Sequence, residues 1–131
     1  MAEVQTLVCP VSGNEPSRRI TSGLDYARVG MAVAVLQRRA GIDLSNHDVF
    51  VNIVGGLKVR EPGIDAAVCV ALASARTGKV LDPKLVFMGE VGLAGEIRRV
   101  SQQERREKEV RSLGYTTLPS VRDIKEVLGR K

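Results

Sequence analysis

The chain has 131 residues, of which 44% are apolar and 27% charged, the composition of an ordinary globular domain. This length suits one domain that buries a core without needing a disulfide or a bound metal. The uncharged runs, such as residues 66–75, are too short to cross a bilayer, and no secretory signal opens the sequence, so we expect a cytoplasmic protein without membrane contact. The net charge of +5 weakly favours a polyanionic partner.

The first third of the sequence predicts two strands and a long helix. Residues 3–9 alternate enough to form a strand, and residues 18–21 are expected to pair back as a second strand. Residues 24–40 have helical length and are apolar around most of the circumference, which predicts a largely buried helix. Arg28 and Arg39, eleven residues apart, share its remaining face.

The middle of the sequence predicts a buried strand followed by a buried helix. Residues 48–54 are rich in β-branched side chains at both alternating sets of positions, which is typical of a strand covered on both faces. Residues 64–77 predict a helix that ends at Gly78, and residues 85–88 predict a short strand. Glycine recurs at every third position in residues 89–97, but neither a Walker loop nor a GxGxxG motif is present, so we expect tight β-turns there.

The last third predicts a surface helix, a short strand and a final helix. Ser101 and Glu104 form a capping box for a helix over residues 102–113. A strand is expected near residues 115–118 and a helix over residues 121–128. Strands and helices alternate, but not regularly enough for a doubly wound sheet. The prediction is an α/β (α+β) domain of two layers, a mixed sheet with helices.

The cysteines and the single histidine do not predict a metal site. Cys9 and Cys69 lie far apart without a CxxC pair or a Cys/His cluster, so we expect buried, reduced thiols. His47 precedes a predicted strand and has no nearby cysteine with which to bind zinc. Metal ligands are therefore not expected in this sequence.

Several motifs, taken in order, resemble one family. They are AEVQTLV (2–8), TSGLDYARVGMAVAVLQRRAG (21–41), HDVFVNIVGGLKVREPGIDAAVCVALAS (47–74) and VFMGEVGLAGEIRRVSQQERREKEVRSLGY (86–115). Together they resemble the C-terminal domain of the RadA (Sms) family, RecA-like bacterial proteins of DNA repair and recombination. The resemblance implies the Lon protease-like fold, which is also that of ribosomal protein S5 domain 2.

The resemblance also implies that residues 1–131 are one domain excised from a longer protein. Family members carry a zinc finger and an ATPase core, but this sequence has neither a four-cysteine cluster nor a Walker loop. ATP and zinc are therefore expected only in the other parts of such a protein, and no cofactor is expected in this domain.

The resemblance to Lon raises the question of peptide hydrolysis, which in Lon-type proteases uses a Ser-Lys dyad. The serine position, directly after Pro62, is occupied here by Gly63, and the lysine position aligns with Glu104. Ser74 lies within a buried helix and Ser101 is explained as a helix cap, so no other dyad is evident. We expect no catalytic residues and no enzyme activity in this domain, and an active Ser-Lys peptidase is the least favoured alternative.

The remaining hypothesis is a noncatalytic module. The resemblance implies a hexameric ring that holds DNA during branch migration. Basic residues near the second predicted helix and after the glycine-rich turns are candidates for contacts with DNA phosphates: Lys58, Arg60, Arg98 and Arg99. Arg28 matches a family motif position and is a further DNA candidate, although it could equally tie its helix to a neighbouring subunit.

A different class stays open, a purely structural oligomerisation domain without DNA contact. Its arginines would then pair across subunit interfaces. The basic residues of the predicted helix at 102–113 alternate with glutamates, as on a solvated and salt-bridged helix face, so they are not favoured as DNA contacts. By contrast, the only acidic residues close in sequence to the four favoured phosphate contacts (Lys58, Arg60, Arg98 and Arg99) are Glu61 and Glu96.

Overall fold

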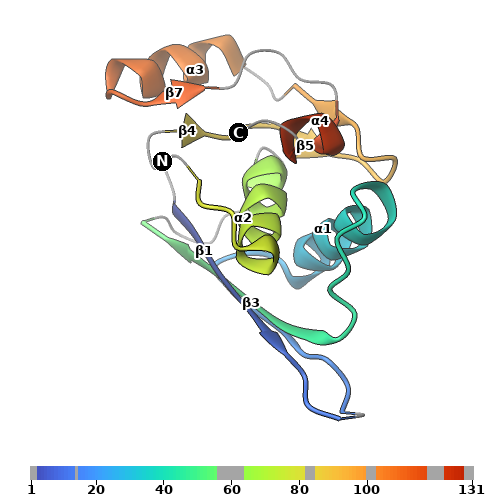
Figure 1. The fold of residues 1–131 in the computed structure, drawn as a ribbon. Helices are drawn as coiled ribbons and strands as arrows, with labels where there is room; N and C mark the ends of the chain where they lie inside the picture. Colours follow the sequence, from blue (N-terminus) through green and yellow to red (C-terminus); the bar gives the residue numbers. More distant parts are fainter. Residues whose placement is uncertain are drawn as a thin grey trace.

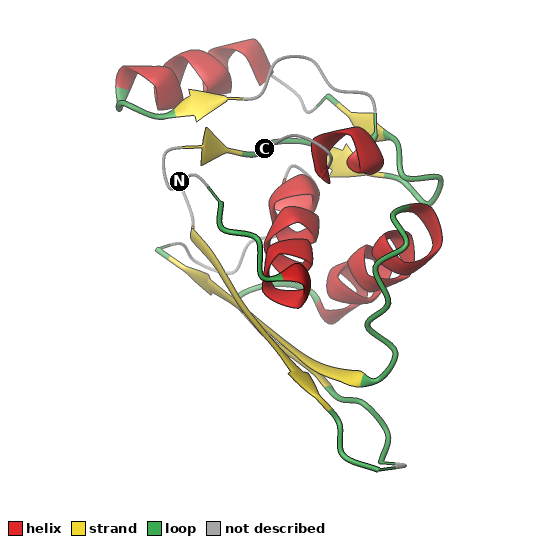
Figure 2. Cartoon of the chain, in the orientation of Figure 1, coloured by secondary structure: helices red, strands yellow, loops and turns green. Residues whose placement is uncertain are grey.

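The computed structural model describes residues 3–13, 15–55, 64–81, 85–99, 103–117 and 123–128. In chain order the elements are β1 (Glu3–Pro10), β2 (Arg19–Ser22), α1 (Tyr26–Arg39), β3 (His47–Val54), α2 (Asp65–Thr77), β4 (Leu85–Val86), β5 (Glu90–Val91), β6 (Ile97–Arg98), α3 (Gln103–Ser112), β7 (Thr116–Thr117) and α4 (Ile124–Leu128). Helices α1 and α2 cover one face of the sheet that contains β1 and β3, whereas α3 and β7 lie at the other end of the molecule (Figure 1). Figure 2 shows the same separation of strands and helices, which confirms the predicted mixed α+β class.

The largest sheet has the strand order β1-β3-β2, with β3 antiparallel to β1 and parallel to β2. The strand predicted near residues 18–21 is therefore present, but the expectation that it pairs back on the first strand is wrong. The Asp48 carboxylate accepts hydrogen bonds from the Arg18 backbone N–H at 2.7 Å and from its guanidinium at 3.2 Å. The Val49 N–H also donates to the Arg18 carbonyl at 2.8 Å, so the start of β2 is fixed beside β3.

Strand β3 is covered on one face in the described part of the chain, not on both as its composition predicted. Val49, Val51 and Ile53 point into the core and are buried. On the opposite face Phe50 is only half-buried and Asn52 is exposed. A high content of β-branched residues therefore did not require a second covering layer in this part of the chain.

Both long helices begin and end as the sequence indicated. The side chain of Asp25 accepts a hydrogen bond from the Ala27 N–H at 3.2 Å and caps α1. Helix α2 ends at Gly78, which has a φ of 77° and donates its N–H to the Ser74 carbonyl. Each helix presents several fully buried residues to a shared core.

Cys69 of α2 lies in the centre of that core. Its side chain is completely buried, and burial raises the pKa of the thiol to about 12. Cys9 on β1 is half-buried, and both cysteines are free, as expected. The Thr6 hydroxyl donates to the Ala71 carbonyl at 3.0 Å and joins β1 to the helix above it.

The C-terminal part consists of short elements around a β-hairpin. Strands β5 and β6 pair antiparallel, and their turn is closed by the Gly92 N–H to the Glu96 carbonyl and the Gly95 N–H to the Gly92 carbonyl. This confirms the tight β-turns predicted for residues 89–97. The Ile124 N–H donates to the Gly95 carbonyl at 2.8 Å, so the buried start of α4 is anchored on the hairpin.

The predicted strands at 85–88 and 115–118 are present as the shorter β4 and β7, which pair parallel. The predicted helices at 102–113 and 121–128 correspond to α3 and α4. The capping serine, Ser101, lies outside the described residues. Among the helices described, none is long and apolar enough to span a membrane.

Candidate nucleic-acid interface

The N-terminal end of α2 is tied to α1 and to the hairpin by the carboxylate of Asp65. One oxygen, Oδ1, accepts a hydrogen bond from Nη1 of Arg28 at 3.0 Å, and the other, Oδ2, accepts from the Val91 N–H at 3.2 Å. The Ala66 N–H of the same helical turn donates to the Gly89 carbonyl at 3.1 Å. The Asp65 carboxylate and the Ala66 N–H at this helix end are therefore already paired within the chain.

The ion pair between Arg28 and Asp65 is largely shielded from water. The two side chains are 27% and 14% exposed, respectively. Burial raises the pKa of Asp65 above its usual range, although the hydrogen bonds from Val91 and Arg28 oppose this increase. The structure thus places Arg28, a sequence candidate for DNA contact, in an intramolecular ion pair with a largely buried carboxylate.

The space beside this ion pair is small. The cavity has a volume of about 10 Å³, which is about the room needed by one water molecule. Its lining is mainly apolar and is contributed by Arg28, Met31, Ala32, Val35, Asp65, Cys69 and Val91. No peptide or cofactor fits into this cavity as it stands.

Arg98 and Arg99 lie at the end of the hairpin and are the most exposed of the described sequence candidates. Their side chains are 60% and 59% exposed. The Arg98 guanidinium lies 4.0 Å from Glu90 and 3.7 Å from Glu96, and that of Arg99 lies 3.9 Å from Glu107. The expectation that only Glu96 lies close to them was therefore incomplete, because Glu90 and Glu107 are brought near by the fold.

These ion pairs are long and exposed to solvent, and they leave most guanidinium N–H groups available. Exposed pairs of this kind contribute about 0 to 1 kcal/mol, because water and salt screen the charges. A phosphate can therefore replace or share the carboxylate partner at little cost. The two arginines remain competent to bind an anion.

The hairpin backbone keeps Glu96 beside Arg98. A Cβ atom built on Gly92 would lie 1.6 Å from Oε1 of Glu96, so the carboxylate occupies the space that the absent side chain leaves. Directly before β5, a Cβ on Gly89 would lie 2.6 Å from Cγ2 of Ile97 on β6. Both glycines thus permit close contacts that set the shape of the hairpin.

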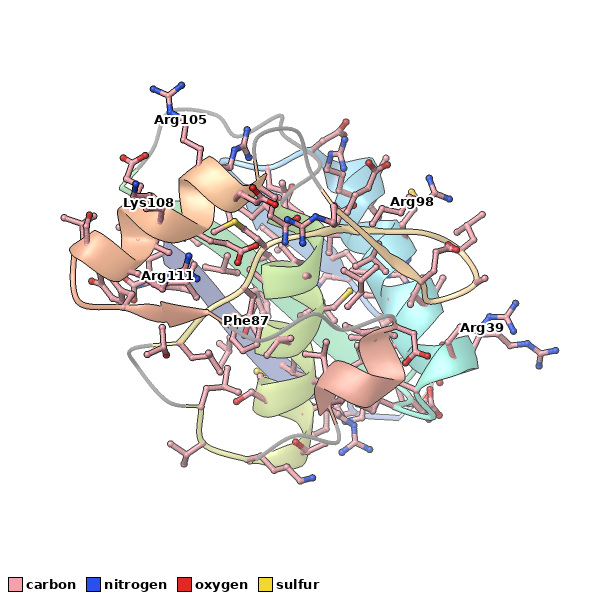
Figure 3. All side chains as sticks on the ribbon, turned by 90° about the horizontal axis from the view of Figure 1, so that it is seen from above. Arg39, Phe87, Arg98, Arg105, Lys108 and Arg111 are labelled. Atoms are coloured by element: carbon pink, nitrogen blue, oxygen red, sulfur yellow. The ribbon has the colours of Figure 1, made fainter. Side chains whose placement is uncertain are left out.

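Helix α3 combines paired and unpaired basic residues. Arg111 pairs with Glu107 at 3.7 Å across one helical turn, as predicted for a salt-bridged face. Arg105 and Lys108, however, extend away from the ribbon in Figure 3 and make no ion pair with another described residue. Exposed Glu104 and Glu109 on the same helix offset their charge, so α3 does not form a strongly basic surface.

Several sequence candidates can be placed only in part. Lys58, Arg60 and Gly63 lie outside the described residues. Glu104, at the position of the dyad lysine in the resembled proteases, is exposed on α3. The Ser74 hydroxyl donates to the Lys79 carbonyl, which accounts for that serine. Within the described ranges, no group of three or more histidine, cysteine or acidic side chains could hold a metal ion.

Sequence reasoning missed two interactions of the basic residues. The pairing of Asp65 with Arg28 depends on how α1 and α2 cross. Arg39 was assigned only to the polar face of its helix, yet its Nε donates to the carbonyl of Leu93 on the hairpin at 3.3 Å. Neither contact has a local sequence signal, because 37 and 54 residues separate the partners.

The fold is therefore a two-layer α+β domain whose hairpin presents adjacent exposed arginines to solvent. No family model matches the chain. It is 50% identical over 117 residues to DNA repair protein RadA of Streptococcus pyogenes serotype M3 (strain ATCC BAA-595 / MGAS315), an alignment that covers 88% of this chain and 25% of the relative. It is 44% identical over 115 residues to DNA repair protein RadA of Synechocystis sp. (88% of this chain, 23% of the relative) and 43% identical over 115 residues to that of Bacillus subtilis (88% and 25%).

The chain is thus homologous, over most of its length, to the C-terminal portion of DNA repair protein RadA. It spans about a quarter of the length of these relatives. This confirms the resemblance that the ordered motifs indicated.

Proposed function

We propose that this domain is a noncatalytic part of a DNA repair and recombination ATPase, where it binds the DNA backbone and helps a hexameric ring to assemble. The observation that carries the DNA proposal is the pair of adjacent, exposed arginines on one hairpin, Arg98 and Arg99. Relatives named as DNA repair proteins make DNA the natural polyanion.

The chemistry of the hairpin favours phosphates over bases. Guanidinium groups form bidentate, charge-assisted hydrogen bonds with phosphate oxygens. Only 3% of the residues are aromatic and none is tryptophan, so the chain offers little surface on which bases could stack. Contacts of this type would hold DNA without reading its sequence. Lys58 and Arg60 remain candidates for the same role, and Arg28 contributes by fixing the hairpin.

Three features support the noncatalytic part of the proposal. The dyad positions of the resembled proteases are occupied by Gly63 and Glu104. In addition, the Ala66 N–H at the start of α2 is bonded to the Gly89 carbonyl, so it does not point at a free oxyanion position. The cavity beside Arg28 is also too small for a peptide. Replacing Gly63 with serine is not expected to produce hydrolysis, because the base would still be missing.

The assembly part of the proposal is supported by the outer face of the main sheet. Leu7, Phe50 and Ile20 are paired across β1, β3 and β2 and form an apolar row on this face. Leu7 is 57% and Ile20 49% exposed. A ring would also present many copies of the hairpin to one DNA molecule, so weak contacts would add up.

The test compares the wild type with an Arg98→Ala/Arg99→Ala variant. Binding of a fluorescein-labelled, mixed-sequence DNA duplex is followed by anisotropy at several salt concentrations, and molar mass is measured by light scattering. We expect wild-type affinity to fall steeply with salt and the variant to bind more weakly with unchanged mass. Absence of wild-type binding at low salt would contradict the DNA proposal.

A second candidate is a structural oligomerisation domain without DNA contact. The acidic neighbours of Arg98 and Arg99 favour it, since such mixed clusters also occur at protein interfaces. In that case the same variant would change the molar mass of the assembly, and the wild type would not bind DNA.

A further inference from the structure

Arg39, the last residue of α1, is held against the hairpin in a defined position. Its Nε donates a hydrogen bond to the carbonyl of Leu93, which lies in the turn between β5 and β6. Its side-chain stem lies against Gly95, where an added Cβ would come within 3.1 Å of Cβ of Arg39. The Nε hydrogen bond leaves the terminal Nη groups free to bind another molecule.

The charge of Arg39 is not offset within the described part of the chain. No ion pair joins it to a described acidic residue, in contrast to Arg98, which has two glutamates nearby. The preceding residue, Arg38, is also exposed, so the end of α1 carries two adjacent positive charges. Cations at a helix C-terminus are favoured by the dipole, but Arg39 reaches beyond its own helix to the hairpin.

Arg39 and Arg98 are both attached to the hairpin, Arg98 as part of β6 and Arg39 through a hydrogen bond from α1. Arg98 belongs to β6, and Arg39 is bonded to the turn that leads into this strand. Figure 3 shows both guanidinium groups extending outward on the same side of the view, around the hairpin. The hydrogen bond to Leu93 and the packing against Gly95 therefore fix Arg39 relative to the hairpin that contains Arg98.

We propose that Arg39 is a further phosphate contact, which extends the DNA-binding surface of Arg98 and Arg99 across the hairpin to the end of α1. This inference rests on the proposed function. The regularly spaced phosphates of a DNA backbone can bind several separated guanidinium groups at once. A single small anion cannot bridge groups that lie apart in this way, so DNA suits the arrangement of Arg39, Arg98 and Arg99 better. Prior anchoring of Nε also reduces the entropy lost when the side chain binds.

The test measures binding of the labelled mixed-sequence duplex by the 131-residue protein across a salt series. Each phosphate contact contributes about 0.9 to the slope of log affinity against log salt. Arg39→Gln is therefore expected to reduce the magnitude of this slope by about 0.9 and to weaken binding about eightfold near 0.1 M salt. Arg39→Lys keeps the charge and is expected to retain the wild-type slope.

Arg76 provides a matched control. Its Nε also donates to a backbone carbonyl, that of Asp43, at 3.0 Å, and its side chain is exposed. It belongs to the last turn of α2, and this end of the helix lies far from the hairpin strand β5 (Figure 1). Arg76→Gln removes the same charge and should leave the slope unchanged.

The outcomes separate this inference from the proposed function. If Arg39→Gln keeps the wild-type salt slope while the Arg98 and Arg99 variant binds DNA more weakly, the role of Arg39 is overturned and the proposed function stands. An equal loss in Arg76→Gln, or an altered molar mass in Arg39→Gln, also overturns it, because the effect would be net charge or subunit contact. Absence of DNA binding by the wild type overturns both proposals.

Discussion

Replacing Arg28 by methionine should lower the free energy of unfolding by about 2 kcal/mol at neutral pH. The change keeps an apolar stem but removes the cation that pairs with Asp65 at 3.0 Å. Removing one partner of a fully buried pair costs about 3 to 5 kcal/mol, whereas exposed pairs contribute about 0 to 1 kcal/mol. With side chains 27% and 14% exposed, this pair lies between those limits.

The effect should also depend on pH, with a sign set by Asp65. Burial raises the pKa of this carboxyl in the folded state above the ordinary aspartate value of 3.8, so the folded protein binds the proton more tightly than the unfolded chain. Stability is therefore lost as pH rises from about that ordinary value through the folded-state pKa. Without Arg28 the pKa of Asp65 should rise further, which makes the loss larger. Well below the ordinary value Asp65 is protonated in both states, and most of the difference between wild type and variant should disappear.

The measurement is urea unfolding followed by circular dichroism, at neutral pH and at acid pH, for both proteins. The control is Arg18→Met, which breaks an ion pair with Asp48 of similar length, 3.2 Å, in which the arginine is 67% exposed. It should cost less than about 1 kcal/mol. The double variant Arg28→Met/Asp65→Asn should recover part of the lost stability, because no buried charge remains. A loss in Arg28→Met that is no larger than the control, or that does not change with pH, would refute the reasoning.

Two further predictions concern glycines and thiols. Gly89→Ala should destabilise the fold by about 2 kcal/mol or more, because Gly89 has a φ of 151° and the new Cβ would lie 2.6 Å from Ile97. By contrast, Gly30 lies inside α1 with open space around it, so Gly30→Ala should stabilise the fold by about 0.5 to 1 kcal/mol. Thermal unfolding of both variants tests this contrast, and equal effects would contradict it. In the native protein, iodoacetamide should alkylate the half-buried Cys9 before Cys69, because the thiol of Cys69 is fully buried and has a pKa of about 12. In urea, both cysteines should react at similar rates. Mass spectrometry of peptides follows the reaction, and early labelling of Cys69 would show that α2 opens readily.

The sequence predicted the elements of this fold better than the way they meet. Helices α1 and α2 have strong local signals, namely helical length, apolar residues around most of the circumference and a glycine after the last turn, and these do not depend on tertiary contacts. The place of β2 beside β3 depends on Asp48 binding Arg18, thirty residues apart in sequence, and on which strand is central. The order in which strands pair is determined by long-range contacts, and the residue pattern of a single segment gives no information about these contacts.

The same distinction applies to the candidate site. Residue type directed attention to arginines, but the environment of each arginine depends on the fold. Arg28 and Arg39 lie on one helix and were equivalent by spacing, yet one pairs with Asp65 and the other with a carbonyl of the hairpin. Arg98 lies near Glu90 because β5 and β6 are paired in register. Counting the acidic residues close in sequence therefore underestimated how far carboxylates offset the charges of Arg98 and Arg99.

These contacts also couple the buried ion pair to the exposed surface. Arg28 and Arg39 are separated by about 16 Å along α1, given the rise of an α-helix. The hairpin is bound near both: the Val91 N–H donates to Asp65, the partner of Arg28, and the Leu93 carbonyl accepts from Arg39. Loss of Arg28 would leave Asp65 to be protonated or rehydrated and would loosen the first of these attachments. Under the proposed function, Arg28 would therefore influence DNA binding without touching DNA, by holding in place the strand pair that carries Arg98.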